Sequence, residues 1–344
     1  MERKFHPIYS YNMTLTESEF LAREFKLKLT EINPSLEKDL KQKKVFLLAT
    51  CDPKEIETVL IDCQDKSVVL FFFGNETYDI PQTIWLNKYS TKIKHCFIYN
   101  LPRKTSYLVT LRCLLGAIYD GGLIKWKKNR NILRNFKNGI DLMRRTRRLE
   151  LNFSYSDFPQ GYSKRFVKEL SLFAEKLKNG SILDRAPLKL SIKKQRISFV
   201  GQSGSWCREI AINVLSKLEK NYEPTYTSGW GGSNQGNQIP YISALAESKL
   251  SLNPPGNLTN RTHRYLESLI MNALPVLPPA TLQDPHLWGV WSEFEKPTLF
   301  SWKKNIKSTL KMNSKRREEM ILEALLHEKS KIKQINSKLN LLLN

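Results

Sequence analysis

The sequence of 344 residues lacks several features that would assign it to a familiar class of protein. No stretch approaches the roughly 20 apolar residues that cross a bilayer, and the first residues contain no apolar signal-peptide core. The five cysteines are scattered, odd in number and without a C-x-x-C pair, which disfavours a disulfide framework and a structural zinc site. We therefore expect a cytoplasmic protein with reduced thiols.

Recognisable metal-binding patterns are also missing. The five histidines show no metal-ligand spacing, and no Asp-x-Asp occurs that could hold Mg²⁺ or Mn²⁺ against a diphosphate. We expect no metal and no other cofactor. Any diphosphate chemistry would then depend on basic side chains and helix ends.

Negative charge is scarce, with 33 acidic residues against 55 lysines and arginines and a formal net charge of +22. This balance indicates a phosphate-bearing partner, which could be nucleic acid, an anionic membrane surface or a phosphorylated small molecule. The segment Lys125–Arg148 reads as a basic amphipathic helix. It suits peripheral binding to the inner face of a membrane, or it is a solvated helix that packs its apolar side on the sheet.

Short apolar runs alternate with helical stretches, which predicts an α/β fold throughout. Buried strands are expected at Lys44–Thr50, Ser67–Phe73 and His95–Tyr99, followed by a helix at Lys164–Lys178 and a linker at Asn179–Pro187.

Three domains follow from this pattern. We expect a Rossmann-like domain with a basic helical region over residues 1–185, a second Rossmann-like domain over 186–300 and a basic helical extension over 301–344. In the extension, the expected packing stripe consists of Ile321, Leu322, Leu325 and Leu326.

The second domain begins with an arrangement typical of anion binding. A strand at Arg196–Val200 leads through the small-residue loop Gly201–Ser205, which includes Ser203, into a helix at Trp206–Lys220 that carries Arg208 in its first turn. A helix start offers unpaired N–H groups, and glycine lets a phosphate approach the backbone. The alternative is a tight turn beside a solvated arginine.

A second unit of the same kind follows. A helix at Ile239–Ala246 precedes a strand at Ser248–Asn253, a helix at Arg261–Asn272 and a strand at Leu274–Leu277. In the longer helix Arg264 and Glu267 share a face, where guanidinium suits a diphosphate and carboxylate suits a ribose diol. The alternative is an intrahelical ion pair of a few tenths of a kcal/mol.

The run Ser248–Gly256, then Arg264-x-x-Glu267 and Ala273-Leu-Pro-Val276, resembles the donor-binding signature of exostosin-like glycosyltransferases. The resemblance covers roughly residues 190 to 280. It implies two Rossmann-like domains facing a central cleft (the GT-B architecture), and an inverting transfer from a nucleotide-sugar to a glycan or lipid-linked acceptor. The implied donor-binding residues are Gly201, Ser203, Arg208, Asn253, Gly256, His263, Arg264 and Glu267. Two departures from the family are Asn253, where a small residue is usual, and the lack of the membrane anchor of eukaryotic members.

Inversion requires a base that deprotonates the acceptor hydroxyl. Glu76 is the first candidate and Asp79 the second, because both follow the apolar strand Ser67–Phe73 at its carboxyl end. Asp120 is a third. Each could instead be a loop carboxylate that caps a turn.

Two other functions fit parts of the sequence. The charge of +22 would suit a nucleic-acid-binding protein, although no zinc finger, basic zipper or RNP-type aromatic pattern is present, so nucleic acid is the less favoured partner. A non-catalytic nucleotide-sugar-binding homologue is the other alternative.

Overall fold

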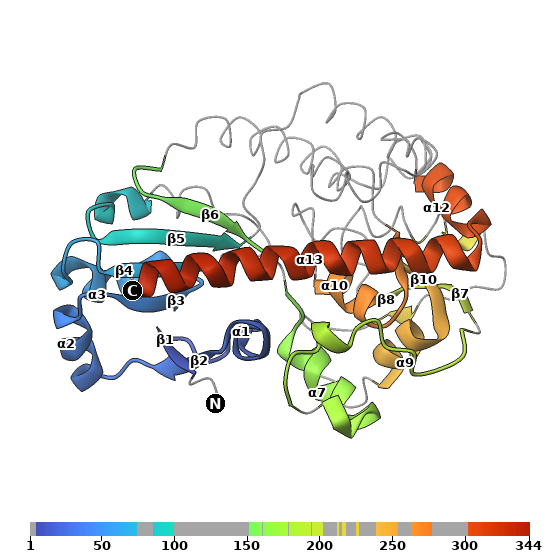
Figure 1. Cartoon of the computed structure of the whole chain (residues 1–344), viewed down its shortest axis with the longest axis horizontal. Coiled ribbons are helices and arrows are strands. Elements are labelled where there is room, and N and C mark those ends of the chain that lie inside the picture. The colour runs from blue at the N-terminus through green and yellow to red at the C-terminus, as the bar shows by residue number, and fades with distance from the viewer. Residues whose placement is uncertain are drawn as a thin grey trace. The chain divides into compact units, whose positions relative to one another are not determined.

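The computed structural model describes most of the chain in two compact units (Figure 1). The described residues are 5–73, 85–99, 151–159, 161–177, 179–193, 195–201, 212, 215–217, 225–226, 239–253, 263–276 and 302–344. Those within Met1–Pro102, Arg145–Ile182 and Glu328–Asn344 form unit 1, and those within Leu183–His327 form unit 2. The structure confirms the expected α/β class.

Unit 1 is built on a six-stranded sheet in the order β2-β1-β3-β4-β5-β6, in which every neighbouring pair is parallel. The strands are β1 (His6–Ser10), β2 (Leu27–Glu31), β3 (Phe46–Thr50), β4 (Val68–Phe72), β5 (Ile93–Tyr99) and β6 (Tyr155–Phe158). The chain runs from β1 outward to β2 and then returns to the other side of β1 as β3. This reversal creates a switch point at the carboxyl ends of β1 and β3, where open α/β sheets bind ligands.

The three strands predicted for this unit are confirmed as β3, β4 and β5. β3 and β4 are buried along their whole length, because central parallel strands are covered on both faces and so read as continuous apolar runs. β1, β2 and β6 were not predicted. Each carries exposed polar positions, and β2 and β6 are edge strands, so none of them shows a continuous apolar run.

The helices of unit 1 follow local capping signals. Asn33 accepts a hydrogen bond from the Leu36 amide (2.9 Å) at the start of α2, and Ser163 accepts one from the Phe166 amide (3.1 Å) at the start of α7. Each such cap stabilises a helix by about 1 kcal/mol. The elements are α1 (Ser18–Phe25), α2 (Pro34–Gln42), η1 (Pro53–Ile56), α3 (Glu57–Asp62), η2 (Leu86–Tyr89), α7 (Lys164–Phe173) and η4 (Glu175–Leu177).

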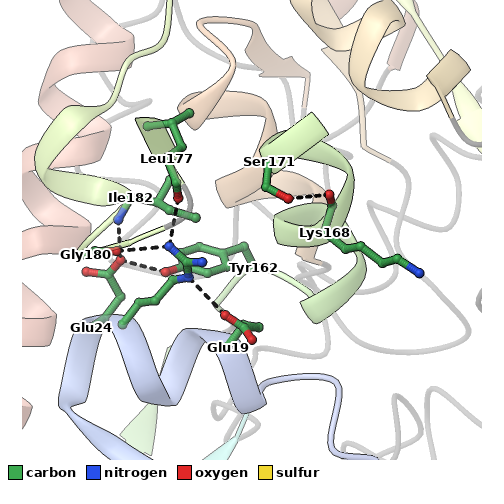
Figure 2. A network of polar contacts seen from close by, with 9 residues as sticks. Glu19, Glu24, Tyr162, Lys168, Ser171, Leu177, Gly180 and Ile182 are labelled. Carbon is green, nitrogen blue, oxygen red and sulfur yellow. Dashed lines mark hydrogen bonds and ion pairs between the residues drawn. The ribbon is translucent and has the colours of Figure 1, made fainter. Parts of the chain in front are cut away.

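A polar network ties α1 to the end of the Arg145–Ile182 part of unit 1 (Figure 2). Glu24 accepts hydrogen bonds from the Tyr162 hydroxyl (2.7 Å), the Ser181 hydroxyl (2.7 Å) and the Ile182 amide (3.0 Å). Arg23 donates to the carbonyls of Leu177 (2.9 Å) and Gly180 (3.2 Å), and Nε pairs with Glu19. The predicted linker 179–187 is therefore held at its beginning by α1, and the boundary between the units falls inside it, after Ile182.

The C-terminal residues form the helices α12 (Trp302–Lys311) and α13 (Ser314–Leu343). The last turns of α13 belong to unit 1, where the Leu342 carbonyl accepts a hydrogen bond from Lys94 of β5 (2.6 Å). The predicted packing stripe is wrong at two positions, because Leu322 is 47% and Leu326 is 65% exposed. The buried stripe is instead Met320, Ile321, Ala324 and Leu325.

Unit 2 contains a three-stranded parallel sheet in the order β11-β10-β7 and a parallel pair formed by β8 and β9. Its elements are η5 (Leu183–Arg185), β7 (Gln195–Ser198), β8 (Val200–Gly201), β9 (Thr225–Tyr226), α9 (Ile239–Glu247), β10 (Ser248–Leu252), α10 (His263–Ile270) and β11 (Leu274–Val276). The predicted strands and helices that overlap β7, α9, β10, α10 and β11 are confirmed within one or two residues at most ends. Because β7, β10 and β11 are parallel, their carboxyl ends lie at the same edge of the sheet.

Candidate functional site

The candidate site lies at the carboxyl edge of the unit 2 sheet. β7 continues through Phe199 into β8 and ends at Gly201, while β10 ends just before Asn253. The amide of Asn253 donates a hydrogen bond to the Val276 carbonyl (3.1 Å), which ties the end of β10 to the end of β11. Because parallel strands place ligand-binding groups beyond their carboxyl ends, this edge is the expected location of a site.

Helix α10 supplies three of the predicted binding residues, His263, Arg264 and Glu267, and its packing fixes the helix in place. Every residue from Tyr265 to Ile270 is buried. The helix ends at Ile270 and is followed by Asn272, whose φ of 57° is left-handed; the Asn272 amide donates to the Leu269 carbonyl (3.1 Å) and the Ala273 amide to the Ser268 carbonyl (2.9 Å). This is a Schellman motif, which satisfies the terminal carbonyls and turns the chain directly into β11.

Arg264 connects α10 to the end of β8 at this edge. Its guanidinium donates a hydrogen bond to the Val200 carbonyl and occupies the space where residue 201 would carry a Cβ, 2.5 Å from each terminal nitrogen. The same group lies over the rings of Phe199 (5.6 Å) and Tyr241 (5.8 Å). Two cation–π contacts of about 0.5 to 2 kcal/mol each hold the charge at a defined place.

Glu267 lies one turn further along α10 and is only 3% exposed. It accepts a hydrogen bond from the Tyr241 hydroxyl at 2.6 Å. Tyr241 therefore contacts both the arginine and the carboxylate, through its ring face and its hydroxyl respectively. A carboxylate held in this way is oriented before any ligand arrives.

Asn253 reaches the same helix through Ser268. The side-chain amide of Asn253 donates to the Ser268 hydroxyl at 3.2 Å, and that hydroxyl donates to the Arg264 carbonyl. Asn253 is 4% exposed and Ser268 is fully buried. The end of β10 and the first turns of α10 are thus connected by one short polar chain.

The opposite ends of α9 and α10 are held by Lys193, which precedes β7. Its ammonium group donates to the carbonyls of Leu245 (3.2 Å) and Met271 (2.7 Å), at the carboxyl ends of the two helices. Burial, reinforced by the nearby charge of Arg317, lowers the pKa of Lys193 to about 8. Lys193 lies at the amino-terminal side of β7, so it braces the helices and does not face the candidate site.

The structure brings together four of the eight predicted donor-binding residues. Gly201 and Arg264 are in contact, Asn253 connects to Arg264 through Ser268, and Glu267 lies on the same helix. His263 begins α10 and is partly exposed. Outside the described residues are Ser203, Arg208 and Gly256 of the donor set, the base candidates Glu76, Asp79 and Asp120, and the basic segment Lys125–Arg148.

The guanidinium of Arg264 lies in the space beside Gly201. The sequence predicts that this glycine lets a phosphate approach the backbone, and the structure adds that the Arg264 side chain lies at the same place. The glycine permits the arginine to lie flat against the strand end. Sequence reasoning also missed Phe199 and Tyr241, since an aromatic residue in a strand or helix has no local pattern that separates a site residue from a core residue.

Unit 1 carries acidic residues at its own switch point, after β3. The Thr50 hydroxyl donates to the Asp52 carbonyl (2.6 Å), and its oxygen lies 3.2 Å from the Glu55 carboxylate. Burial raises the pKa of the neighbouring Cys51 thiol to about 12, and the charges of Glu17, Glu55 and Asp52 add to this rise. A loop that gathers carboxylates at this edge could supply a base, and sequence reasoning had not considered it.

Two absences apply to the described part of the chain. No three His, Cys, Asp or Glu side chains gather there in a way that could hold a metal ion. Among the described helices, none combines the length and apolar character that a membrane span requires. A comparison with known proteins adds no assignment, because no protein-family model matches the chain and no curated protein matches it.

Proposed function

We propose that the chain is a glycosyltransferase of the GT-B type that binds a nucleotide-sugar donor in unit 2. The observation that carries this proposal is the position of Arg264, held against Val200 and Gly201 and between Phe199 and Tyr241. An arginine fixed at the carboxyl edge of a parallel sheet suits a diphosphate, since its planar fork can bind two phosphate oxygens.

In this mechanism Arg264 stabilises the charge that grows on the diphosphate as the glycosidic bond breaks. The guanidinium carries five N–H donors, of which Nη1 donates to the Val200 carbonyl, and we assign the other donors to the diphosphate. Arg208 and the helix starts near Ser203 and Gly256 would add to the same stabilisation. Transfer would need no metal, because these groups replace the ion.

Glu267 is assigned to the ribose of the nucleotide. A carboxylate accepts hydrogen bonds from the two hydroxyls of a ribose diol, and Tyr241 holds this one in place. Its burial limits contact with water, so the hydrogen bond to a ligand would form without loss of an extensive hydration shell.

The acceptor, a glycan or a lipid-linked sugar, is assigned to unit 1. Glu76 and Asp79 remain the first candidates for the base that gives inversion, and Glu55 is an additional candidate at the switch point. The cytoplasm remains the expected compartment, and Lys125–Arg148 the proposed contact with an anionic membrane.

The proposal is tested by release of nucleoside diphosphate from a panel of UDP-, GDP- and TDP-sugars in the presence of EDTA. We expect the wild type to release nucleoside diphosphate from at least one donor, and we expect the rate of release to fall at least tenfold in Arg264→Ala. Arg316→Ala is the matched control, because Arg316 pairs with Glu319 and Glu323 on α13 and is not one of the predicted binding residues. Binding without release would favour a non-catalytic homologue. Absence of both, with salt-dependent binding to random DNA, would favour a nucleic-acid-binding protein.

A further inference from the structure

Asn253 contains a buried hydrogen-bond acceptor that no group in the described part of the chain satisfies. Its side chain is 4% exposed, and its Oδ1 atom has no hydrogen-bond partner. Buried polar atoms in native proteins nearly always have a partner, because an unmade hydrogen bond in the interior is costly. An unsatisfied acceptor at the end of a strand, where ligands bind, therefore indicates a ligand group.

The Ser268 hydroxyl determines which atom of the Asn253 amide lacks a hydrogen-bond partner. Ser268 has one hydroxyl hydrogen, which it donates to the Arg264 carbonyl, a group that can only accept. The Ser268 oxygen must then accept from Asn253, so the Asn253 atom that faces it is the Nδ2 donor. The two contacts together fix the amide orientation and leave Oδ1 as the unsatisfied atom.

The chemistry of this atom excludes part of a nucleotide-sugar. Ionised phosphate oxygens accept hydrogen bonds and cannot donate them, so the diphosphate cannot satisfy Oδ1. Only a hydroxyl or an N–H group can. On the proposed function, Arg264 binds the diphosphate and Glu267 binds the ribose, and the sugar that is transferred remains to be recognised.

We propose that Asn253 determines sugar specificity by accepting a hydrogen bond from a hydroxyl or amide N–H of the transferred sugar. This inference rests on the proposed function. A site built to hydrogen-bond a substrate hydroxyl discriminates strongly against a ligand that lacks it, because the buried protein group is then left unpaired. Asn253 would thus supply discrimination at the position where the resembling family has a small residue.

Isothermal titration calorimetry of the wild type and of Asn253→Leu tests this inference. The ligands are UDP, UDP-glucose, UDP-N-acetylglucosamine and the matching GDP compounds. Leucine has a similar volume and no acceptor. We expect about a tenfold loss of affinity for the preferred nucleotide-sugar and an unchanged affinity for the matching nucleoside diphosphate. Ser248→Ala is the control, because Ser248 is also fully buried but lies at the opposite end of β10.

A second readout separates a ligand contact from a structural role. Asn253→Leu removes the Nδ2 hydrogen bond to Ser268 along with the unsatisfied acceptor, so its melting temperature without ligand should fall slightly. The rise in melting temperature on adding the nucleotide-sugar should be smaller than in the wild type, whereas the rise on adding the matching nucleoside diphosphate should be the same, which a purely structural role would not produce. If Asn253→Leu does not fold, Asn253→Ser gives the same comparison with the small residue usual in the family.

Three results would overturn the inference. An unchanged affinity for nucleotide-sugars would mean that water or another part of the chain satisfies Oδ1. An equal loss for the nucleoside diphosphate and its sugar would place Asn253 at the nucleotide. If the wild type binds none of the nucleotides, the proposed function fails and this inference fails with it.

Discussion

The guanidinium of Arg264 lies where a side chain on residue 201 would begin, so Gly201 and Arg264 depend on each other. A Cβ at this position would lie 2.5 Å from both terminal nitrogens and 2.9 Å from the central carbon of the group. The clash is with the far end of a flexible side chain, so the arginine can move away.

We therefore predict that Gly201→Ala lowers the free energy of unfolding by about 1 to 2 kcal/mol, because the displaced arginine loses its contacts with Val200, Phe199 and Tyr241, and lowers nucleotide affinity nearly as much as Arg264→Ala does. Chemical denaturation and calorimetric titration of both variants check this. A Gly201→Ala variant with normal nucleotide affinity would show that the position of Arg264 is not needed for binding.

Gly161 provides the contrasting case in unit 1. A Cβ there would lie well inside contact distance of the Phe20 ring, which is fully buried and packs edge-on against Phe25 and Tyr162. This ring cannot move aside without disturbing the core, so Gly161→Ala should cost about 3 kcal/mol of unfolding free energy. Urea denaturation measures it, and a cost no larger than that of Gly201→Ala would contradict the packing described.

Tyr241→Phe separates the two contacts of Tyr241. The ring over Arg264 is kept, while the hydrogen bond to Glu267 is lost. We expect a loss of about 1 to 2 kcal/mol in stability, since the acceptor is a buried carboxylate, together with weaker nucleotide binding. Tyr11→Phe is a matched control, because it removes a similar bond of 2.8 Å to Glu37 in unit 1. Equal effects of the two variants on nucleotide affinity would argue against a positioning role for Tyr241.

Acid should destabilise the protein through His95. This residue is fully buried in β5, with its ring nitrogens 2.8 Å from the Ser154 hydroxyl and 2.9 Å from the Ser156 hydroxyl. Burial, with a contribution from the charge of Lys338, lowers the pKa of His95 to about 4, against about 6.5 in the unfolded chain.

Between these values the unfolded state binds more protons, so stability falls as the pH drops from about 6.5 to about 4, by up to about 1.4 kcal/mol per pH unit. The slope should be smaller in His95→Gln, which keeps a hydrogen-bonding side chain without the titration. Denaturation curves at several pH values measure both slopes, and identical slopes would contradict this account.

The hydrogen bonds that Glu24 accepts from Tyr162, Ser181 and Ile182 should contribute measurably to the stability of unit 1. Burial raises the pKa of Tyr162 above its usual range, and the Glu24 carboxylate adds to this rise, so the hydroxyl stays a donor at any working pH. Tyr162→Phe should cost about 1 to 3 kcal/mol and increase hydrogen exchange at the Ile182 amide. Tyr155→Phe, at a tyrosine that is 41% exposed, should change neither. Unchanged exchange at Ile182 in Tyr162→Phe would show that the segment is held by other contacts.

The sequence predicts the strands that are buried on both faces and misses those that are not. β3, β4 and β5 have long apolar runs, whereas β1, β2 and β6 mix polar and apolar residues and are recognisable only once their neighbours are known. The same limit explains Leu322 and Leu326, because helical periodicity identifies several apolar stripes on α13 but not the one that meets a partner.

The site shows a similar division. The βα pattern places Gly201 and Arg264 at one edge, since the carboxyl ends of parallel strands meet there. Side-chain packing between elements far apart in sequence brings Arg264 beside Gly201. The same packing lets Tyr241 contact both Arg264 and Glu267, so no local pattern predicts these contacts. The unsatisfied acceptor of Asn253 likewise depends on the orientation imposed by Ser268.

Nucleotide binding to unit 2 is the claim on which the proposed activity depends. Calorimetric titration measures this binding most directly. The full chain, Arg264→Ala and Glu267→Ala are each titrated with uridine, guanosine and thymidine diphosphates. We predict that the wild type binds at least one of these nucleotides and that each variant, still folded, binds it at least tenfold more weakly. Equal affinity in the wild type and both variants, or no binding to any nucleotide, would contradict the account.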